Sequence, residues 1–243
     1  MNCIETLYHS PHVYAGNTWR GVETDVNDTY SGFSICHYVG DSEQHITECR
    51  SSLRYCLGID ENHLIVPRQT HSINIVVIDR IPFEPAELNG VDAVITGLKG
   101  VAVGVNTADC VPVILIDENA SLIAAVHAGW RGAVADIVPA TVERMKALSA
   151  KSIKAYIGPC ICEKCFEVGD EVAERFPEFV IKRNYGVKPH IDLQGFVMNQ
   201  IENAGVECPQ KSIPCTRCNP EHYFSARAHG INSGRNFSFA ILL

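Results

Sequence analysis

The amino-acid sequence predicts an α+β fold in which mixed β-sheets form the core and helices flank it. Short apolar, β-branched runs separated by turn residues fill the middle of the chain, and runs of this length and composition are typical of buried strands. Segments with a helical spacing of apolar residues are fewer. They do not alternate regularly with the strands, so a regular βαβ series is not expected.

Seven segments are predicted to be strands because each is a short apolar or β-branched run bounded by turn residues. They are Ile73–Ile78, Ala93–Thr96, Val101–Val105, Val111–Ile116, Leu122–Val126, Ala155–Ile157 and Phe237–Leu242. Several contain no polar side chain, which indicates strands that are buried on both faces.

Three longer segments have the apolar spacing of helices. The first begins at Asp41 or Ser42, either of which can cap a helix N-terminus. In the second, Pro139 interrupts the pattern and predicts either a kink or a late helix start. The third opens on an aspartate cap and ends on a glycine that suits a left-handed C-terminal residue. These segments are Asp41–Leu57, Ala133–Leu148 and Asp192–Gly205.

The composition is that of an ordinary globular protein. The chain has 243 residues, of which 46% are hydrophobic and 20% charged, and it carries a formal charge of −8. Without a flexible linker or an internal repeat, residues 1–243 are expected to form a single domain. The acidic balance and the scattered basic residues argue against a nucleic-acid surface. The apolar runs are too short to cross a membrane, and no signal peptide is visible, so we expect a cytoplasmic protein.

The cysteine count is high and odd, at eleven. In a chain without an export signal, reduced thiols or metal ligands are expected rather than a disulfide framework. Cysteine also packs well as a small apolar side chain, and this interpretation covers the five cysteines that lie outside recognisable motifs. These are Cys3, Cys36, Cys49, Cys56 and Cys208.

Two histidines and a cysteine lie directly beside predicted strands: His71 in RQTHS, Cys110 in TADC and His127 in HAGWRG. If the sheet brings them to one edge, they form a donor set suited to catalytic zinc, with one position open for water or substrate. Their separations of 39 and 17 residues match no compact metal motif. The spacing therefore leaves open a second interpretation, a buried cysteine and capped histidines without a joint site.

Signatures of several enzyme classes are absent from the sequence: it has no GxGxxG after a strand, no P-loop, no HExxH and no GxSxG. The motifs that it does contain resemble, in their order, those of the YfiH family, also called the laccase-domain or polyphenol-oxidase family. The resemblance runs from about Arg20 to the C-terminus, and TADC followed 17 residues later by HAGWRG is its most specific part. The matching motifs are RQTHS, DAVITG, TADCVPVIL, AAVHAGWRG, GPCI, FEVGDEV, DLQGFVMNQIENAGV and FSARAHGINSGRNFSFAIL.

This resemblance implies a zinc-dependent purine nucleoside phosphorylase with adenosine deaminase and methylthioadenosine phosphorylase activities. It also implies the metal ligands, which carry over to His71, Cys110 and His127. Zinc is expected rather than copper, because the ten histidines include no HxH pair from which a multicopper cluster could be built. The expected partners are purine nucleosides and phosphate, and we expect a monomer.

The N-terminal part departs from the family pattern. The family commonly has TTRxGGVS followed by YxSLNLGxHVGD, whereas this chain has NTWRGVETDV and YSGFSICHYVGD. Arg20 and the Val39–Asp41 turn are retained. The usual asparagine is replaced by Ser34, and the usual histidine by Tyr38, with His37 one place earlier. A substrate contact made through either family residue is therefore not carried over.

The HAGWRG segment predicts a phosphate pocket. Gly129 and Gly132 allow a sharp turn from strand into helix, a helix N-terminus attracts phosphate, and Arg131 adds a guanidinium fork. The alternative role for Arg131 is a structural ion pair. The full set of candidate substrate- or phosphate-binding residues is Arg20, Gln69, Arg131 and Arg227.

Two aspartates and one further arginine are also candidates for the site. Asp92 and Asp109 could orient a ligand imidazole, although capping or backbone bonding is the common role of an aspartate near a turn. Arg227 and Arg235 frame the C-terminal motif and either contact substrate or anchor the terminal strand.

Two further segments, CICEKC and CTRC, contain CxxC pairs, which are typical of structural zinc sites. In the family that the chain resembles, Cys160 and Cys215 are common at these points, whereas Cys162, Cys165 and Cys218 lie at variable positions. The sequence therefore favours reduced packing thiols, with a second metal site or a redox-labile pair as alternatives.

The leading hypothesis is that phosphate attacks the anomeric carbon of a purine nucleoside and releases free base and ribose 1-phosphate. Three alternatives stay open. Cys110 could be the nucleophile of a metal-independent hydrolase with His127 or His71 as its base. The chain could also be a copper polyphenol oxidase, or a zinc-stabilised binding module without turnover.

Overall fold

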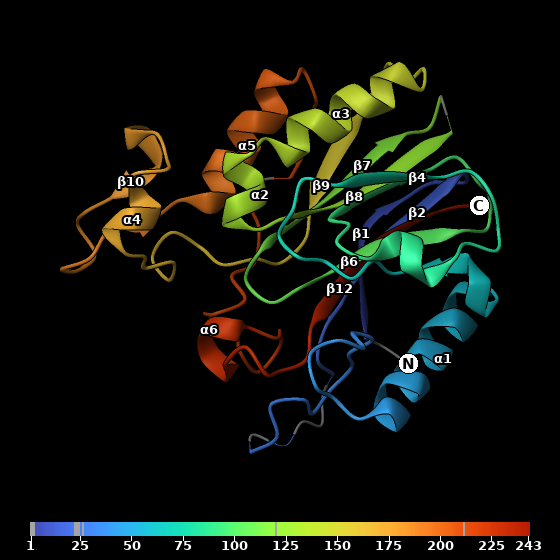
Figure 1. Cartoon of the computed structure of the whole chain (residues 1–243), viewed down its shortest axis with the longest axis horizontal. Helices are drawn as coiled ribbons and strands as arrows, with labels where there is room; N and C mark the ends of the chain where they lie inside the picture. The colour runs from blue at the N-terminus through green and yellow to red at the C-terminus, as the bar shows by residue number, and fades with distance from the viewer. Residues whose placement is uncertain (1–2, 22–24, 26, 120, 211) are drawn as a thin grey trace.

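The computed structural model describes residues 3–21, 25, 27–119, 121–210 and 212–243. Two five-stranded sheets form its centre, and helices lie on both sides of the pair (Figure 1). The first sheet contains, in order, β1 (Ile4–His9), β2 (Val13–Thr18), β12 (Asn236–Leu242), β6 (Ala102–Thr107) and β3 (Leu64–Ile65). The second contains β4 (Ile75–Ile78), β5 (Ala93–Thr96), β8 (Leu122–Ala128), β7 (Val111–Asp117) and β9 (Lys154–Ile157). A small third sheet pairs β10 (Ile181–Lys182) with β11 (His190–Ile191).

Both large sheets are mixed, as the sequence predicted. β3 pairs with β6 and β4 pairs with β5 in the parallel direction, whereas the other pairs in the two sheets are antiparallel. The helices are α1 (Glu43–Leu57), α2 (Trp130–Val134), α3 (Ile137–Ala147), α4 (Asp170–Ala173), α5 (Leu193–Asn203) and α6 (Ala226–His229), with short 3₁₀ turns at Glu61–His63, Pro85–Leu88 and Glu178–Val180. Within the described ranges, no helix is both long enough and apolar enough to cross a membrane.

The core has three layers of buried apolar side chains. One layer fills the space between the two sheets and includes Val103 and Ile114. A second lies between the second sheet and α3 and α5, where Met145 is fully buried. The third packs α1 on the outer face of the first sheet through Leu53 and Phe237. Burial on both faces explains why the central strands have almost no polar positions.

All seven predicted strands are present, with bounds that differ from the expected ones by at most two residues. Five strands were not predicted: β1, β2, β3, β10 and β11. The last three have only two residues each, and Gly16 weakens the strand pattern of β2. The structure gives a reason for this glycine: a Cβ at position 16 would lie 2.8 Å from Cγ2 of Ile4 and 3.1 Å from Cζ of Phe239.

The predicted helices are also present, and the second is divided. α2 ends at Val134 and α3 begins at Ile137, with Asp136 between them in the left-handed region at φ 61°. Pro139 is the third residue of α3, where its missing N–H has no partner to lose. The late helix start is therefore confirmed.

Candidate active site

The register of the second sheet brings distant segments to one edge. Cys110 directly precedes β7 and Asp92 directly precedes β5. β8 runs antiparallel to both strands, so its end lies beside their beginnings, and His127 is paired with Pro112. His71 lies in the loop before β4, which is parallel to β5. Four residues from four segments therefore meet at this edge.

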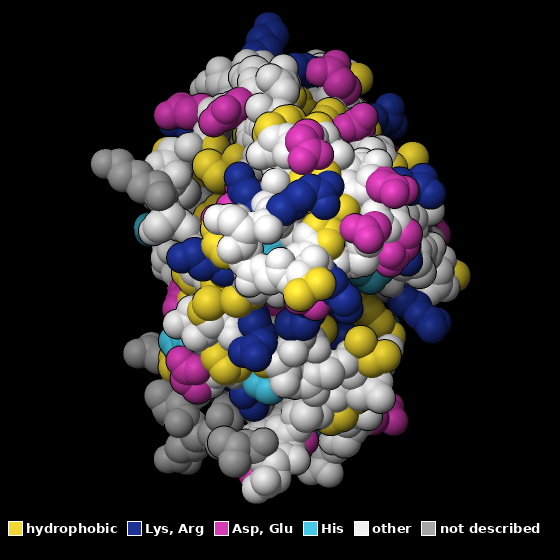
Figure 2. All heavy atoms as spheres, turned by 90° about the vertical axis from the view of Figure 1, so that its left-hand side faces the viewer, with side chains coloured by type: hydrophobic (Ala, Val, Ile, Leu, Met, Phe, Trp, Pro, Cys, Tyr) yellow, Lys and Arg dark blue, Asp and Glu magenta, His cyan; other side chains and the backbone are white. Residues whose placement is uncertain are grey.

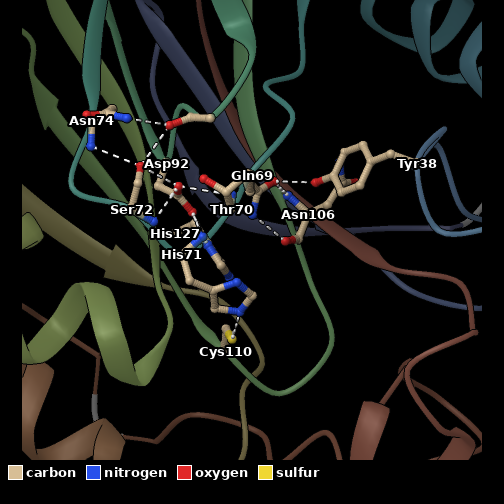
Figure 3. A network of polar contacts seen from close by, with 11 residues as sticks. Tyr38, Gln69, Thr70, His71, Ser72, Asn74, Asp92, Asn106, Cys110 and His127 are labelled. Atoms are coloured by element: carbon tan, nitrogen blue, oxygen red, sulfur yellow. Dashed lines mark hydrogen bonds and ion pairs between the residues drawn. The ribbon is translucent and has the colours of Figure 1, made fainter.

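The three predicted ligands form one cluster, which Figure 3 shows at close range. Sγ of Cys110 lies 3.7 Å from Nε2 of His71, and one ligand atom from each of His71, Cys110 and His127 lies within 4.8 Å of the others. The two imidazole rings are 4.8 Å apart and nearly perpendicular, at 73°. His127 is buried, Cys110 is half-buried and His71 is exposed, so the cluster opens to solvent on the side of His71.

The chain passes directly beneath this cluster at Gly129. A Cβ at position 129 would lie 2.6 Å from Cδ2 of His71 and 3.1 Å from Sγ of Cys110. Every other residue has a Cβ, so this close approach requires a glycine at position 129. The backbone angle does not require it, because the φ of Gly129 is an ordinary −66°.

Asp92 holds both histidines through one buried carboxylate (Figure 3). Its Oδ1 lies 2.7 Å from Nδ1 of His127 and accepts a 3.0 Å bond from the backbone N–H of His71. Its Oδ2 accepts from the backbone N–H groups of Thr70 and Ser72 and from the Ser72 hydroxyl. His71 is in the left-handed region at φ 61°, which costs about 1–2 kcal/mol, and these bonds hold it there.

The cluster is strongly polarised. Burial opposes the charged form of Cys110, but the neighbouring imidazoles of His127 and His71 outweigh burial and lower the pKa of the thiol to about 6. Burial likewise opposes a charged His127, but Cys110 and Asp92 raise its pKa to about 9. For Asp92, the bonds from His127 and Ser72 outweigh burial and lower its pKa to about 2. Without a metal, the imidazoles therefore favour the thiolate form of Cys110, and the thiol and Asp92 favour the charged form of His127.

A pocket of about 400 Å³ opens onto the cluster. A larger hollow of about 660 Å³ shares Tyr38 with it but contains none of the three cluster side chains. The smaller pocket is therefore the candidate substrate site. It is lined by Tyr38, Gln69, His71, Asn106, Thr107, Ala108, Asp109, Cys110, His127, Ala226, Arg227, Ile231 and Arg235.

Two of the four predicted substrate residues, Gln69 and Arg227, line this pocket. The Gln69 amide pairs with the backbone of Asn106 through bonds of 2.7 and 2.8 Å, and its Oε1 also accepts a 3.1 Å bond from the Tyr38 hydroxyl. The guanidinium of Arg227 donates to the carbonyls of Cys165 and Glu167. Both side chains are thus held in the pocket wall by fixed partners.

The other two predicted substrate residues lie elsewhere. Arg20 is buried and donates to the carbonyls of Ser31 and Pro220, so it fastens these segments and does not line the pocket. Arg131 is exposed, and its guanidinium lies 4.3 Å from the ring centre of Trp130. It is absent from the pocket lining among the described residues. The helix that was expected to bind phosphate, α2, has only five residues.

The two aspartates differ in role. Asp92 contacts an imidazole, whereas the carboxylate of Asp109 accepts 2.7 Å bonds from the Thr216 hydroxyl and from the backbone N–H of Arg227. Asp109 therefore ties the C-terminal segments to the loop that carries Cys110, and the expectation that it orients an imidazole does not match these contacts.

The departures from the family pattern lie close to the pocket. Tyr38 lines it, and Ser34 is buried and accepts a 3.0 Å bond from the backbone N–H of Arg235. The guanidinium of Arg235 donates to the carbonyls of Ile231 and Ser233, so it anchors the turn before β12 while lining the pocket. The sequence did not single out Asn106, Thr107 or Ile231; their positions depend on the fold.

Two imidazoles and a thiolate at the edge of a sheet, open to a pocket with polar walls, form the kind of site found in metal-assisted or thiol-dependent enzymes. Residues 17–243 match the family described as multi-copper polyphenol oxidoreductase laccase. The chain therefore belongs to this family, the YfiH or laccase-domain family, and the resemblance seen in its motifs is confirmed.

Relatives of the chain include proteins with purine nucleosides in their names. It is 43% identical to an adenosine deaminase, RL5, of an unknown prokaryotic organism, over 93% of this chain and 92% of that protein. It is 37% identical to a purine nucleoside phosphorylase of Bacteroides thetaiotaomicron, over 86% of this chain and 84% of that protein. The solved structure of YfiH from Bacillus licheniformis matches all of both chains with a TM-score of 0.84 at 25% identity.

Proposed function

We propose that the chain is a purine nucleoside phosphorylase that binds zinc through His71, Cys110 and His127. The observation that carries this proposal is the convergence of the three ligand atoms, within 4.8 Å of one another, at one side of the pocket. Relatives named purine nucleoside phosphorylase and adenosine deaminase support the choice of substrate.

The donor atoms fit zinc. Two imidazole nitrogens and one thiolate are borderline-soft ligands, and three protein ligands leave a fourth position for substrate. Asp92 accepts from Nδ1 of His127, which leaves Nε2 free to face the metal, and a carboxylate behind a histidine is the usual support of a zinc ligand. Two histidines and one cysteine are also the ligands of single-copper sites, so metal analysis must distinguish zinc from copper.

The residues of the pocket suit a nucleoside and phosphate. The side-chain amide of Asn106, which no described group hydrogen-bonds, and the Tyr38 hydroxyl can hydrogen-bond a purine or a ribose, while Ile231 adds an apolar contact. Arg227 supplies a positive charge for phosphate, together with the N–H groups that are not bonded to the carbonyls of Cys165 and Glu167. Lysine and arginine side chains gather across the middle of the face that carries α4, β10 and α6 (Figure 2), which favours the approach of an anion.

In the proposed reaction, a phosphate oxygen bonds to the anomeric carbon as the bond from that carbon to the purine nitrogen breaks. The purine leaves with the proton that phosphate brought, and the products are free base and ribose 1-phosphate. A bound zinc ion supplies positive charge that polarises and orients the reacting groups. The protein holds its ligands rigidly through Asp92, and the pocket wall positions the nucleoside.

A second candidate activity is the deamination of adenosine, which the name of the 43% identical relative favours. In that reaction water replaces phosphate, and ammonia leaves from the purine. The two activities are separated by their products: inosine indicates deamination, and ribose 1-phosphate indicates phosphorolysis.

The experiment that tests the proposal is a nucleoside panel with and without phosphate, before and after chelation. We expect free base and ribose 1-phosphate to appear in equal amounts only with phosphate, activity to be lost on chelation, and zinc to restore it. A thiol hydrolase, which the low pKa of Cys110 favours, would instead resist chelation, yield free ribose and be blocked by iodoacetamide. If the protein instead oxidises a phenol, and this activity requires copper, the result would support a copper polyphenol oxidase.

A further inference from the structure

A second group of metal-ligand side chains lies outside the pocket. Sγ atoms of four cysteines, two from each CxxC pair, all lie within 4.8 Å of one another. The two pairs are 53 residues apart in the sequence, so the fold alone brings them together. The four are Cys162, Cys165, Cys215 and Cys218, and they are called the four-cysteine cluster below.

We propose that the four-cysteine cluster is a structural zinc site, separate from the His71–Cys110–His127 cluster, that braces the wall of the active-site pocket. Four thiolates and no open position are typical of structural zinc. Packing thiols, which the sequence favoured, do not require four sulfur atoms from two distant loops to converge on one point.

The distances fit this metal. Zinc–sulfur bonds of about 2.3 Å in a tetrahedron place the sulfur atoms about 3.8 Å apart. Sγ of Cys165 lies 3.4 Å from Sγ of Cys218, and the other pairs of the cluster lie within 4.8 Å. All four cysteines are free thiols. A metal ion therefore fits between them with only small side-chain movements.

Backbone hydrogen bonds shape the first loop and join it to a sulfur of the second. The carbonyl of Cys162 accepts from the N–H groups of Cys165 and Phe166, which closes a tight turn between the first two cysteines. The N–H of Cys162 in turn donates to Sγ of Cys215 at 3.3 Å, and such bonds to a ligand sulfur are a usual support of thiolate sites.

The two loops are also joined to each other. Cys160 is not a member of the cluster. Its backbone N–H donates to the carbonyl of Pro214, and its carbonyl accepts from the backbone N–H of Thr216, both at 3.1 Å. This bridge aligns Cys160 with Cys215 and fixes the separation of the two CxxC pairs.

Basic side chains lie on one side of the cluster. A surface hollow beside Cys165 and Cys218 is lined by Lys164, Arg217 and Arg227, with Glu167 as its one acidic side chain among the described lining residues. Four thiolates on one divalent zinc carry a net charge of −2, and the three basic side chains offset it.

The cluster is connected to the pocket through two contacts. Arg227, which lines the pocket, donates to the carbonyl of Cys165. Thr216, which lies between Cys215 and Cys218, donates to Asp109, the residue directly before Cys110. A metal on the four-cysteine cluster would therefore hold the side of the pocket that carries Arg227.

Metal analysis of the full chain, purified under reducing conditions, tests this proposal. We expect two zinc ions per chain in the wild type. The double variant Cys165→Ser, Cys218→Ser should bind one zinc ion, and Cys110→Ala should also bind one. The triple variant that combines these three changes should bind none. Cys56→Ser, which changes an exposed cysteine of α1, is the matched control and should keep two.

The outcomes separate this site from the proposed active site. A wild type with one zinc, lost in Cys110→Ala and kept in the double serine variant, would overturn the four-cysteine assignment and leave the proposed function intact. The four-cysteine assignment would also be overturned if the wild type binds one zinc ion or none and its intact mass shows a disulfide. Iron in place of zinc would overturn it as well. If the wild type binds one zinc ion and the double serine variant binds none, the result would support the four-cysteine site and count against zinc on the His71–Cys110–His127 cluster.

A second measurement avoids variants that fail to fold. Cys110→Ala retains all four cysteines of the cluster, so cobalt added to its metal-free form should give the intense visible absorption of a tetrahedral cobalt tetrathiolate. Absence of this absorption from a folded, reduced Cys110→Ala protein would overturn the proposal.

Discussion

One carboxylate oxygen, Oδ1 of Asp92, contacts both histidines of the cluster: it lies 2.7 Å from Nδ1 of His127 and 3.0 Å from the backbone nitrogen of His71. The side chain of one histidine and the backbone of the other are thus set by the same buried group. His71 is in the left-handed region, which a residue other than glycine adopts at a cost in free energy. Its position therefore depends strongly on the hydrogen bond to Asp92.

Asp92→Asn is therefore expected to weaken zinc binding by roughly 10- to 100-fold, the usual effect of removing the partner of a metal-ligating histidine. An amide has one acceptor oxygen and cannot serve all the donors that Asp92 serves. Zinc affinity, measured by competition with a chromophoric chelator, checks this prediction. Asp79→Asn, which changes an exposed carboxylate beside Arg80, is the control, and equal zinc affinity in both variants would contradict the role of Asp92.

The pH dependence of Cys110 alkylation should report the polarity of the cluster. The thiolate is the reactive form, and it predominates above the pKa of the thiol, which the imidazoles lower to about 6. In the metal-free protein, we expect iodoacetamide to modify Cys110 at half its maximal rate near pH 6, measured by mass spectrometry of the Cys110 peptide. Loss of the reaction as the pH falls below 6 follows from protonation of the thiolate.

His127→Gln provides the comparison, because His127 is the largest favourable influence on that thiolate. The half-point of alkylation should move to higher pH in this variant. Zinc should protect Cys110 in the wild type. A half-point near 9 in the wild type, the ordinary value for a cysteine, would show that the imidazoles do not stabilise the thiolate.

Phosphate binding should depend on Arg227 and not on Arg131. Arg227 lines the pocket, whereas Arg131 lies outside it against Trp130. A hydrogen bond from a charged group contributes about 1.5–3 kcal/mol, so Arg227→Ala should raise the KM for phosphate by about ten- to a hundredfold. Arg227→Lys should restore part of the affinity, since it keeps the charge and loses the fork.

Arg131→Ala is the matched control for this prediction and should leave the KM for phosphate within about twofold of the wild type. Initial rates at varied phosphate and saturating inosine check both values. If Arg131→Ala weakens phosphate more than Arg227→Ala, phosphate binds beside α2, as the sequence alone had suggested.

The sequence predicted the central strands because they depend on local signals, whereas the resemblance of its motifs to the YfiH family implied the three cluster residues as a joint site. β5, β7 and β8 are apolar runs with no competing helical pattern, and His71, Cys110 and His127 lie in distinctive motifs directly beside strands. The misplaced arginines depend on the fold instead. Arg20 and Arg131 stand in matching motifs, but a motif does not show whether a guanidinium faces a pocket, a carbonyl or an indole.

The four-cysteine cluster could not be established from the sequence for a similar reason. Each CxxC pair is a local signal, but the approach of the two pairs depends on the backbone bridge between Cys160 and Cys215. The same holds for Asp92: its contacts with both histidines follow from the register of β5 and β8, which hydrophobic patterning does not specify for strands buried on both faces.

Gly129→Ala tests how closely the chain passes beneath the metal ligands. The added Cβ would lie 2.6 Å from Cδ2 of His71 and 3.1 Å from Sγ of Cys110, so the His71 ring must move away from the other two ligands. We expect loss of zinc from this cluster and of nucleoside cleavage, with little change in melting temperature, because His71 is exposed and not part of the core. Gly186→Ala is the control, since its Cβ would meet no described atom closer than 3.9 Å. Full zinc content and full activity in Gly129→Ala would mean that His71 does not need this position, and would remove it from the ligand set.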